Sequence, residues 1–282
     1  MFFLAYTYTM HLYNCVINTF FIVLIMIFQF WIFNWVLYLK ILWDNKNGDI
    51  MLEFMNLNDK NMIAVQGAGG KTSSVFLLAN EFKSMNEASL VSTTTKMGIV
   101  SKDRFDYLYT FNEKTKIVDG KIYFASKSRT DTKEIGFEPE FFDKIFGEGL
   151  FSNIILETDG AKTRPIKAPR EDEPVNPVNI THCIGVMGLD SVNKPFDERF
   201  CHRVDFMEKI IGNPKTLTTK SYAEIINSNR GLFKNSYDAK KFLILNKADT
   251  QQDIENAMDI IERIDVDVKI FVMSFGKIIK IY

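Results

Sequence analysis

The sequence predicts an α/β fold with a mostly parallel sheet, an antiparallel hairpin insertion and a preceding hydrophobic N-terminal helix. Apolar runs of strand length alternate with segments of helical spacing, the pattern of strand–helix units. The runs that begin at Asn61, Asn153 and Lys241 end in glycine, acidic or amide residues. Because the carboxyl ends of parallel strands share one edge of a sheet, we expect these polar residues to form a ligand site there.

The stretch from Asn61 to Ser74 joins a strand, a glycine-rich turn, Lys71-Thr72 and the start of a helix. Glycines let backbone N–H groups point into a concavity, and a helix N-terminus adds partial positive charge. This predicts a phosphate-binding loop of the P-loop NTPase type, with Lys71 on the outer phosphates and Thr72 on Mg²⁺. Val65 occupies the place of the usual first glycine, so the alternative is a glycine turn that caps an ordinary helix. The expected nucleotide-binding residues are Gly67, Ala68, Gly69, Gly70, Lys71, Thr72 and Ser73.

Composition limits the classes of partner. The chain has 282 residues with 34 Lys and Arg against 35 Asp and Glu, a balance that argues against a general nucleic-acid surface. Its three cysteines make no disulfide framework and no metal-ligand spacing, which fits a reducing cytoplasm.

The first fifty residues differ from the rest. Residues 1–39 contain no Lys, Arg, Asp or Glu, and residues 16–42 are long enough to span a bilayer as a helix. The first charges, Lys40 and Lys46, lie on the C-terminal side of this run, so a spanning helix would tether the protein to the inner face of the membrane. The alternative is an extension without a role in the chemistry. We therefore expect a hydrophobic segment at 1–50 and a P-loop NTPase-like domain at 51–282.

Two strand ends supply candidate metal ligands. Residues 88–91 run into a threonine-rich turn, and Thr94 there could reach Mg²⁺ or the terminal phosphate. The strand that starts at Asn153 delivers Glu157 and Asp159, as expected of a carboxylate that binds Mg²⁺ directly or through water. The alternative is a plain strand followed by an Asp-Gly turn. We expect Lys71, Glu157 and Asp159 to be catalytic, and Thr72, Thr94, Glu157 and Asp159 to bind the metal.

Other segments predict supporting structure. Asp119-Gly120, between short apolar runs, is typical of a hairpin turn and predicts the antiparallel insertion within 106–124. Helical spacing appears at 139–146, 198–211 and 253–264.

A proline-rich segment follows Asp159. Five of the seven prolines lie between Pro165 and Pro195, so this part must be an extended loop of stiff path, and such loops are usually functional. Its basic residues could hold an anionic ligand or could balance the acids at 171–173. The candidate substrate-binding residues are Arg164, Lys167, His202 and Arg203.

The strand from Lys241 runs into Asn246-Lys247-Ala248-Asp249, the Asn-Lys-x-Asp pattern that selects guanine in GTPases. The Asp249 carboxylate can accept hydrogen bonds from the guanine ring N–H and amino group, whereas adenine offers the wrong donors. Lys247 would stack along the base, and Asn246 would fix the loop.

These motifs resemble those of the YqeC family of selenium-dependent hydroxylase accessory, or selenium cofactor biosynthesis, proteins. The resemblance covers roughly residues 58–282, and its most specific element is the combination of 157–162 with Pro165-Ile-Lys-Ala-Pro169. It implies nucleotide binding and a role in the maturation of selenium-containing molybdenum hydroxylases. The sequence motifs that carry the resemblance lie at 67–72, 92–97, 157–162, 165–169, 188–190, 202–203 and 246–249.

We therefore expect a Mg²⁺-dependent NTPase that binds GTP, or else ATP, and assists a selenium- or molybdenum-hydroxylase client. A small-molecule kinase or nucleotidyltransferase is the first alternative, in which the proline-rich loop binds an acceptor. A nucleotide-gated scaffold without turnover is the second.

Overall fold

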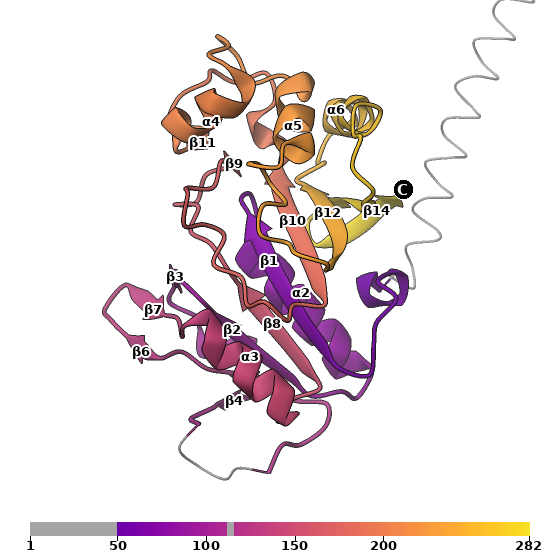
Figure 1. The fold of residues 1–282 in the computed structure, drawn as a ribbon. Helices are drawn as coiled ribbons and strands as arrows, with labels where there is room; N and C mark the ends of the chain where they lie inside the picture. The colour runs from indigo at the N-terminus through magenta and orange to yellow at the C-terminus, as the bar shows by residue number, and fades with distance from the viewer. Residues whose placement is uncertain (1–49, 112–115) are drawn as a thin grey trace, which may run out of the picture. The chain divides into compact units, whose positions relative to one another are not determined.

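The computed structural model describes residues 50–111 and 116–282, which are built around one nine-stranded sheet. The strand order is β14-β13-β12-β10-β1-β8-β2-β5-β4, and every neighbouring pair is parallel except β13 with β14 (Figure 1). This confirms the predicted α/β fold with a mostly parallel sheet. The strands are β1 (Asn61–Gly67), β2 (Ser89–Thr93), β4 (Tyr107–Leu108), β5 (Ile122–Phe124), β8 (Asn153–Glu157), β10 (His182–Gly188), β12 (Lys240–Asn246), β13 (Lys269–Ser274) and β14 (Lys277–Ile281).

Helices cover both faces of this sheet, and two small sheets lie outside it. The α-helices are α2 (Lys71–Ser84), α3 (Pro139–Glu148), α4 (Val204–Ile211), α5 (Thr219–Asn227) and α6 (Gln251–Ile261). The short 3₁₀ helices are η2 (Met51–Phe54), η3 (Lys102–Arg104) and η4 (Leu189–Ser191). The small sheets pair β9 (Ile166–Lys167) with β11 (Cys201–His202), and β3 (Lys96–Gly98) with β7 (Lys133–Ile135) and β6 (Ser128–Arg129).

Successive side chains along the strands pack into two separate hydrophobic clusters, one on each face of the sheet. On β1, Met62 and Ala64 pack into the cluster that includes buried residues of α3, α5 and α6. Ile63 and Val65 pack into the other cluster, with α2 and η2. Successive strand side chains point to opposite faces, so a sheet covered on both sides needs continuous apolar runs. This explains why the strands could be recognised from uninterrupted hydrophobic stretches.

The strand order reverses at β1. From β1 the chain passes through α2 to β2 on one side, and from β8 it returns across β1 to β10 on the other. In open parallel sheets, ligands bind outside the carboxyl ends of the strands at such a reversal. The turn after Gly67 and the residues after Glu157 and Gly188 lie at this point.

The prediction of a hairpin at Asp119-Gly120 was wrong. These two residues do form a turn, but the strand after it, β5, joins the central sheet in parallel with β2 and β4. Its residues Ile122, Tyr123 and Phe124 are fully buried, so they gain more from the central core than from a surface hairpin. The antiparallel insertion lies instead in β3, β7 and β6, where β6 and β7 form the hairpin.

The helix predicted at 198–211 is shorter than expected. Cys201 and His202 form strand β11, and α4 begins only at Val204, after Arg203 in a left-handed conformation with φ of 67°. The helices near 139–146 and 253–264 agree with α3 and α6 to within a few residues at either end.

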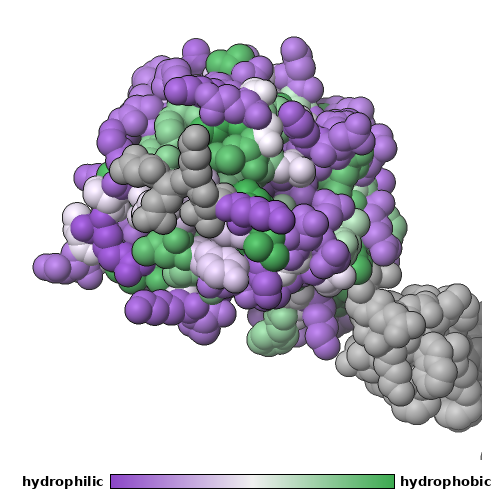
Figure 2. All heavy atoms as spheres, turned by 90° about the horizontal axis from the view of Figure 1, so that it is seen from below, coloured by the Kyte–Doolittle hydropathy of each residue, from purple (hydrophilic) through white to green (hydrophobic). Residues whose placement is uncertain are grey.

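The far edge of the sheet is short and partly apolar. Strand β4 has two residues, Tyr107 and Leu108, and both side chains are exposed. A two-residue edge offers few free backbone groups to another chain. Seen from below, hydrophobic areas are separated by hydrophilic residues (Figure 2).

The domain begins at η2, which is anchored to α2. The backbone N–H groups of Met51 and Leu52 donate to the two carboxylate oxygens of Glu81, at 3.0 Å each, and both residues are buried. Within the described residues, no helix is long and apolar enough to cross a membrane. The helix predicted at 16–42 lies outside those residues.

Candidate functional site

The turn between β1 and α2 depends on glycine at each of its three glycine positions. Gly67, Gly69 and Gly70 have φ angles of 95°, 77° and 142°, which side chains rarely adopt. A Cβ atom on Gly69 would lie 2.2 Å from the backbone nitrogen of Gly188, and one on Gly70 would lie 2.2 Å from Nδ2 of Asn246. The glycines therefore let this turn pack directly against β10 and the end of β12.

Three backbone N–H groups of this turn already donate hydrogen bonds within the protein. The N–H of Gly67 donates to Oδ2 of Asp159 at 3.0 Å, that of Ala68 to Val186 O at 2.8 Å, and that of Gly69 to Arg164 O at 3.1 Å. The first turn of α2 is different, because no side chain caps it and first-turn N–H groups have no intrahelical partner. An oxyanion would fit at Lys71, Thr72 and Ser73, where these free donors and the helix dipole coincide.

Lys71 is the first residue of α2, and its side-chain ammonium group is held by two oxygen atoms. Its Nζ is 2.8 Å from Gly67 O and 3.1 Å from Oδ1 of Asp159, and the residue is 5% exposed. Burial alone would lower the pKa of Lys71, but Asp159 and Glu157 outweigh it and raise the pKa above its usual value. The ammonium group is thus a fixed positive charge.

Glu157 lies at the end of β8, the direct neighbour of β1. Its Oε2 accepts a hydrogen bond of 2.6 Å from the Thr72 hydroxyl. Burial raises the pKa of Glu157, against the opposing effects of Lys71 and Thr72. A carboxylate and a hydroxyl are ligands suited to Mg²⁺, which usually takes one or two carboxylates and completes its shell with phosphate oxygens and water.

Thr94 lies beside this pair. Its backbone N–H donates to Glu157 O at 3.2 Å, and its buried hydroxyl has no hydrogen-bond partner in the described part of the chain. No group of three or more His, Cys, Asp or Glu residues suited to a metal occurs within residues 50–111 and 116–282. The described groups at this point whose chemistry suits Mg²⁺ are the Glu157 carboxylate and the hydroxyls of Thr72 and Thr94.

The end of β12 contacts the glycine turn. Asn246 donates from Nδ2 to Gly69 O at 2.8 Å. Lys247 follows in a left-handed conformation with φ of 63°, and its Nζ lies 2.6 Å from Oδ2 of Asp190. Asp249 is exposed, and its Oδ1 accepts a hydrogen bond of 2.6 Å from the hydroxyl of Ser274, at the end of β13.

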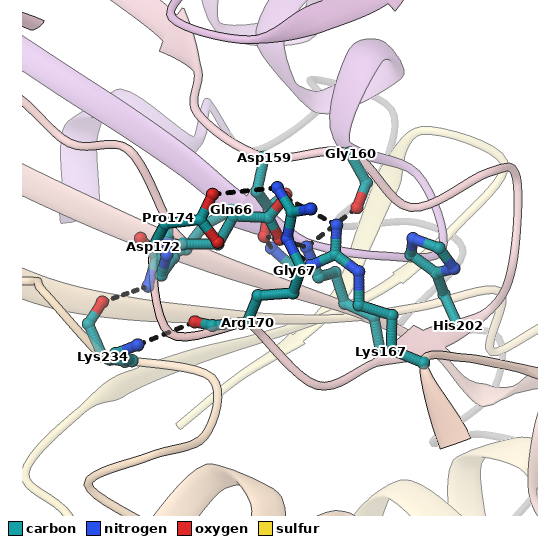
Figure 3. Close-up of polar contacts among 12 residues, drawn as sticks. Gln66, Gly67, Asp159, Gly160, Lys167, Arg170, Asp172, Pro174, His202 and Lys234 are labelled. Carbon is teal, nitrogen blue, oxygen red and sulfur yellow. Dashed lines mark hydrogen bonds and ion pairs between the residues drawn. The ribbon is translucent and has the colours of Figure 1, made fainter. Parts of the chain in front are cut away.

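A buried chain of charges connects Lys71 to the proline-rich segment. Lys167 is 3% exposed, and its Nζ lies 3.0 Å from Oδ2 of Asp159 and 2.8 Å from Oε2 of Glu173. The same Nζ donates to Gly160 O at 2.8 Å (Figure 3). With all three donors engaged, Lys167 serves to fix the segment in place.

Glu173 is surrounded by cations. Arg203 binds both of its carboxylate oxygens, at 2.7 Å for Oε1, and Arg170 lies 3.6 Å from Oε1. Burial would raise the pKa of Glu173, but Arg203 and Lys167 lower it to about 2. This residue remains ionised at any ordinary pH.

His202 lies among the same cations. Burial lowers its pKa to about 4, with further contributions from Arg203 and Lys167. Its imidazole makes no hydrogen bond within residues 50–111 and 116–282, so at neutral pH it offers an uncharged ring with one donor and one acceptor.

These elements surround a cleft of about 850 Å³. Eight of its lining residues are Lys or Arg and two are Glu, although the whole chain has a net charge of −1. Such a concentration of one sign favours an anionic ligand. The charged lining residues are Lys71, Lys96, Lys133, Lys162, Arg164, Arg170, Arg203 and Lys247, with Glu157 and Glu173.

The structure brings most of the sequence-predicted residues together. Those that line the cleft are Gly69, Gly70, Lys71, Thr72, Ser73, Glu157, Arg164, His202, Arg203 and Lys247. Those that do not line it are Gly67, Ala68, Thr94, Asp159, Lys167, Asn246 and Asp249. Three residues of the second group bind lining residues directly: Asp159 binds Lys71, Lys167 binds Glu173, and Asn246 binds Gly69. Asp249 instead accepts a hydrogen bond from Ser274, which does not line the cleft.

Sequence reasoning missed three contributors: Lys133, Glu173 and Ser274. Lys133 comes from the insertion whose strands were assigned to the wrong residues. Glu173 belongs to the acidic run 171–173, a pattern that indicates solvent-exposed surface. The only available signal for Ser274 was its place at the end of a strand after Asp249.

The family model described as "YqeC protein" matches residues 63–205, about half of the chain. The chain is similar to the "Uncharacterized protein YqeC" of Escherichia coli (strain K12), with 29% identity over 182 residues, 62% of this chain and 70% of that protein. No solved structure matches it. The matched range contains the glycine turn, Glu157, Asp159 and Arg203, and it ends before Asn246. The resemblance seen in the sequence is confirmed: the chain belongs to the YqeC family.

Proposed function

We propose that this protein is a Mg²⁺-dependent nucleotide-binding protein of the P-loop NTPase type that prefers GTP. The observation that carries the proposal is the bond from Asn246 to Gly69, which joins a candidate base-binding loop to a candidate phosphate loop. One ligand with a base at one end and phosphates at the other would contact both. The cationic cleft between them supports the same ligand class.

In this proposal the first turn of α2 binds the phosphates through Lys71, Thr72 and Ser73. Thr72 and Glu157 would hold Mg²⁺, with Asp159 or Thr94 as water-mediated ligands, and a bound Mg²⁺ would neutralise charge on the terminal phosphates. Lys71, already cationic, would move its contact from Asp159 to a phosphate oxygen. Asp159 would retain Lys167 as its partner.

Base selection would rest on Asp249. Ser274 donates to Oδ1 of Asp249, and within the described residues no hydrogen bond to its Oδ2 occurs. A carboxylate that accepts from two donors on guanine meets an acceptor on adenine, and the mismatch leaves a polar group unpaired. Lys247, held by Asp190, would lie along the base.

We further propose that nucleotide turnover serves the maturation of selenium-dependent molybdenum hydroxylases in the cytoplasm. The support is the family membership together with the role that the resemblance implies. Catalysis would consist of positioning and charge neutralisation, which predicts a slow intrinsic rate that rises when the client protein binds.

The test is a titration of GTP and ATP into the full chain, with Mg²⁺ and with a chelator, followed by product analysis. Tighter binding of GTP and slow release of inorganic phosphate support the proposal. A modified small molecule in place of free phosphate would identify a kinase or nucleotidyltransferase. Binding without turnover, even with client present, would identify a nucleotide-gated scaffold. Equal affinity for ATP would refute base selection at Asp249.

A further inference from the structure

More cations line the cleft than the proposed nucleotide uses. The terminal phosphates would be held at Lys71 and the base at Lys247 and Asp249, which leaves six basic residues of the lining without a nucleotide contact. These are Lys96, Lys133, Lys162, Arg164, Arg170 and Arg203.

Two of them lie on one face of the small antiparallel sheet. Gly98 of β3 pairs with Lys133 of β7, and Lys96 pairs with Ile135, so both lysine side chains leave the sheet on the same side. Met97 and Glu134 point to the other side and are buried. Both lysines are exposed and line the cleft, and neither makes an ion pair or a side-chain hydrogen bond within the described residues. Two unpaired like charges on one sheet face repel each other unless an anion joins them.

Lys133 also shares the cleft with the proposed phosphate site. Both Lys133 and Glu157, whose Oε2 accepts from Thr72, are lining residues. A ligand held by Lys133 would therefore occupy the same cleft as the terminal phosphate of a bound nucleotide.

The proline-rich segment and Arg203, which follows β11, supply further cations. Arg170 and Arg203 both approach Glu173, which is also bound by Lys167, so a single carboxylate faces three positive charges. A guanidinium group has five N–H donors, and Glu173 can engage only some of them. Arg170 also pairs with Asp172 at 2.9 Å, and Lys167 pairs with Asp159 at 3.0 Å. What this group offers to a ligand is therefore its remaining N–H donors, and both arginines line the cleft.

Uncharged polar groups complete the lining. His202 has no side-chain partner, and the buried hydroxyl of Thr95 has none either, in the part of the chain that the structure describes. Buried polar atoms without partners are uncommon in folded proteins, and the Thr95 hydroxyl is one. A ligand that accepts hydrogen bonds would give a partner to this hydroxyl and to the half-buried His202 ring.

We infer that Lys96, Lys133, Arg170, Arg203 and His202 form a second anion subsite, which binds a small oxyanion-bearing molecule beside the nucleotide. The inference deepens the proposed function and rests on it, because the nucleotide site defines which cations remain. The ligand class is a phosphate- or carboxylate-bearing metabolite. Glu173 acts as a positioning residue that holds both arginines toward the cleft.

The experiment loads the full chain with Mg²⁺ and a non-hydrolysable GTP analogue and then titrates inorganic phosphate, or malonate as the carboxylate probe, by calorimetry. The variant Lys96→Ala/Lys133→Ala should bind the preferred probe at least about tenfold more weakly, since two charge-assisted contacts are lost. Its affinity for the GTP analogue should change by no more than about threefold. The control Lys215→Ala/Lys277→Ala removes the same charge from exposed positions outside the cleft lining and should match the wild type.

Two results would overturn the inference: neither probe binds to the loaded protein, or the lysine variant binds both as the wild type does. If the GTP analogue itself fails to bind, the titration is repeated on the free protein. Phosphate binding that is lost in Lys96→Ala/Lys133→Ala but kept in Lys71→Ala would then uphold the subsite while the nucleotide proposal fails. Binding lost only in Lys71→Ala would reject the subsite.

Discussion

Asn246 donates from its side-chain amide to the carbonyl oxygen of Gly69 at 2.8 Å, across 177 positions of sequence. The contact is possible because Gly70 has no side chain, since a Cβ there would lie 2.2 Å from the same amide nitrogen. The ends of β1 and β12 are not neighbours in the sheet, because β10 lies between them. This hydrogen bond therefore connects the two loops that the proposed nucleotide would bridge.

Replacing Asn246 with alanine should weaken GTP binding by about tenfold or more, because the base loop and the phosphate loop would no longer be fixed to each other. The control is Asn227→Ala, outside the cleft lining, which removes hydrogen bonds of 2.8 Å to Arg263 O and 3.2 Å to Oδ2 of Asp265 and one of 2.9 Å from the N–H of Asp265. Asn246→Ala should lose about 1 kcal/mol of stability, and Asn227→Ala at least as much. Calorimetry and thermal unfolding check the two effects, and equal GTP affinity in both variants would contradict the role of Asn246.

Asp249→Asn should exchange the base preference from GTP to XTP. Guanine offers two donors to a carboxylate, whereas xanthine offers one donor and one acceptor, which match the oxygen and the NH₂ of an asparagine amide. The change in relative affinity should be at least about a hundredfold. Competition binding with the two nucleotides measures it, and the exposed Asp238→Asn serves as the control. If Asp249→Asn still prefers GTP, Asp249 does not read the base.

Gly69→Ala should destabilise the protein by about 2–4 kcal/mol, because alanine is strained at φ of 77° and its Cβ would collide with Gly188 and Pro165 O. Gly147 in α3 is a matched control, since a Cβ there meets no atom within 4 Å. Gly147→Ala should stabilise the protein by about 0.5–1 kcal/mol through helix propensity. Chemical denaturation measures both changes, and similar stabilities for the two variants would contradict the close approach at Gly69.

Much of the fold could be predicted because its strands are buried on both faces. Such strands give unbroken apolar runs, and their polar ends mark the ligand edge, as at Gly67, Glu157 and Asn246. The insertion was assigned to the wrong residues because β3, β6 and β7 have only two or three residues each, too few for periodicity to appear. The turn at Asp119-Gly120 has the right local chemistry, but the tertiary core, which buries Ile122, Tyr123 and Phe124, decides how the next strand pairs.

The candidate site was predictable where one motif carries several residues, and less so where the site depends on distant contacts. Lys71 and Thr72 follow from the glycine turn alone. The position of Lys167 does not, because the sequence cannot show that its ammonium is enclosed between Asp159 and Glu173. Ser274 and Lys133 come from segments that carry no motif and reach the site only through the sheet topology.

Glu81 should make stability depend on pH between about 4.5 and 7. Burial raises its pKa in the folded protein to about 7 from 4.5, despite the bonds from Met51 and Leu52. At this carboxyl the folded state binds more protons than the unfolded state in this range, so its contribution to stability falls as pH rises, by up to about 3 kcal/mol. His202, whose pKa burial lowers to about 4, contributes in the opposite direction, so the effect is measured as a difference between variants. Glu81→Gln should lack the contribution of Glu81, whereas the exposed Glu140→Gln should keep it. Denaturation midpoints at pH 5 and 7 measure the difference, and a Glu81→Gln variant with the same pH dependence as the wild type would contradict the assignment.

The central claim is that the glycine turn and Lys71 bind nucleotide phosphates together with Mg²⁺. Its most direct test is a calorimetric titration of GTP into the wild type, with Mg²⁺ and with a chelator, and into Lys71→Ala, which keeps Lys167 as the partner of Asp159. We predict saturable binding to the wild type, weaker binding without Mg²⁺, and a loss of about a hundredfold or more in a Lys71→Ala protein that is still folded by circular dichroism. Unchanged affinity in Lys71→Ala, or no binding of GTP or ATP to the wild type, would contradict the account.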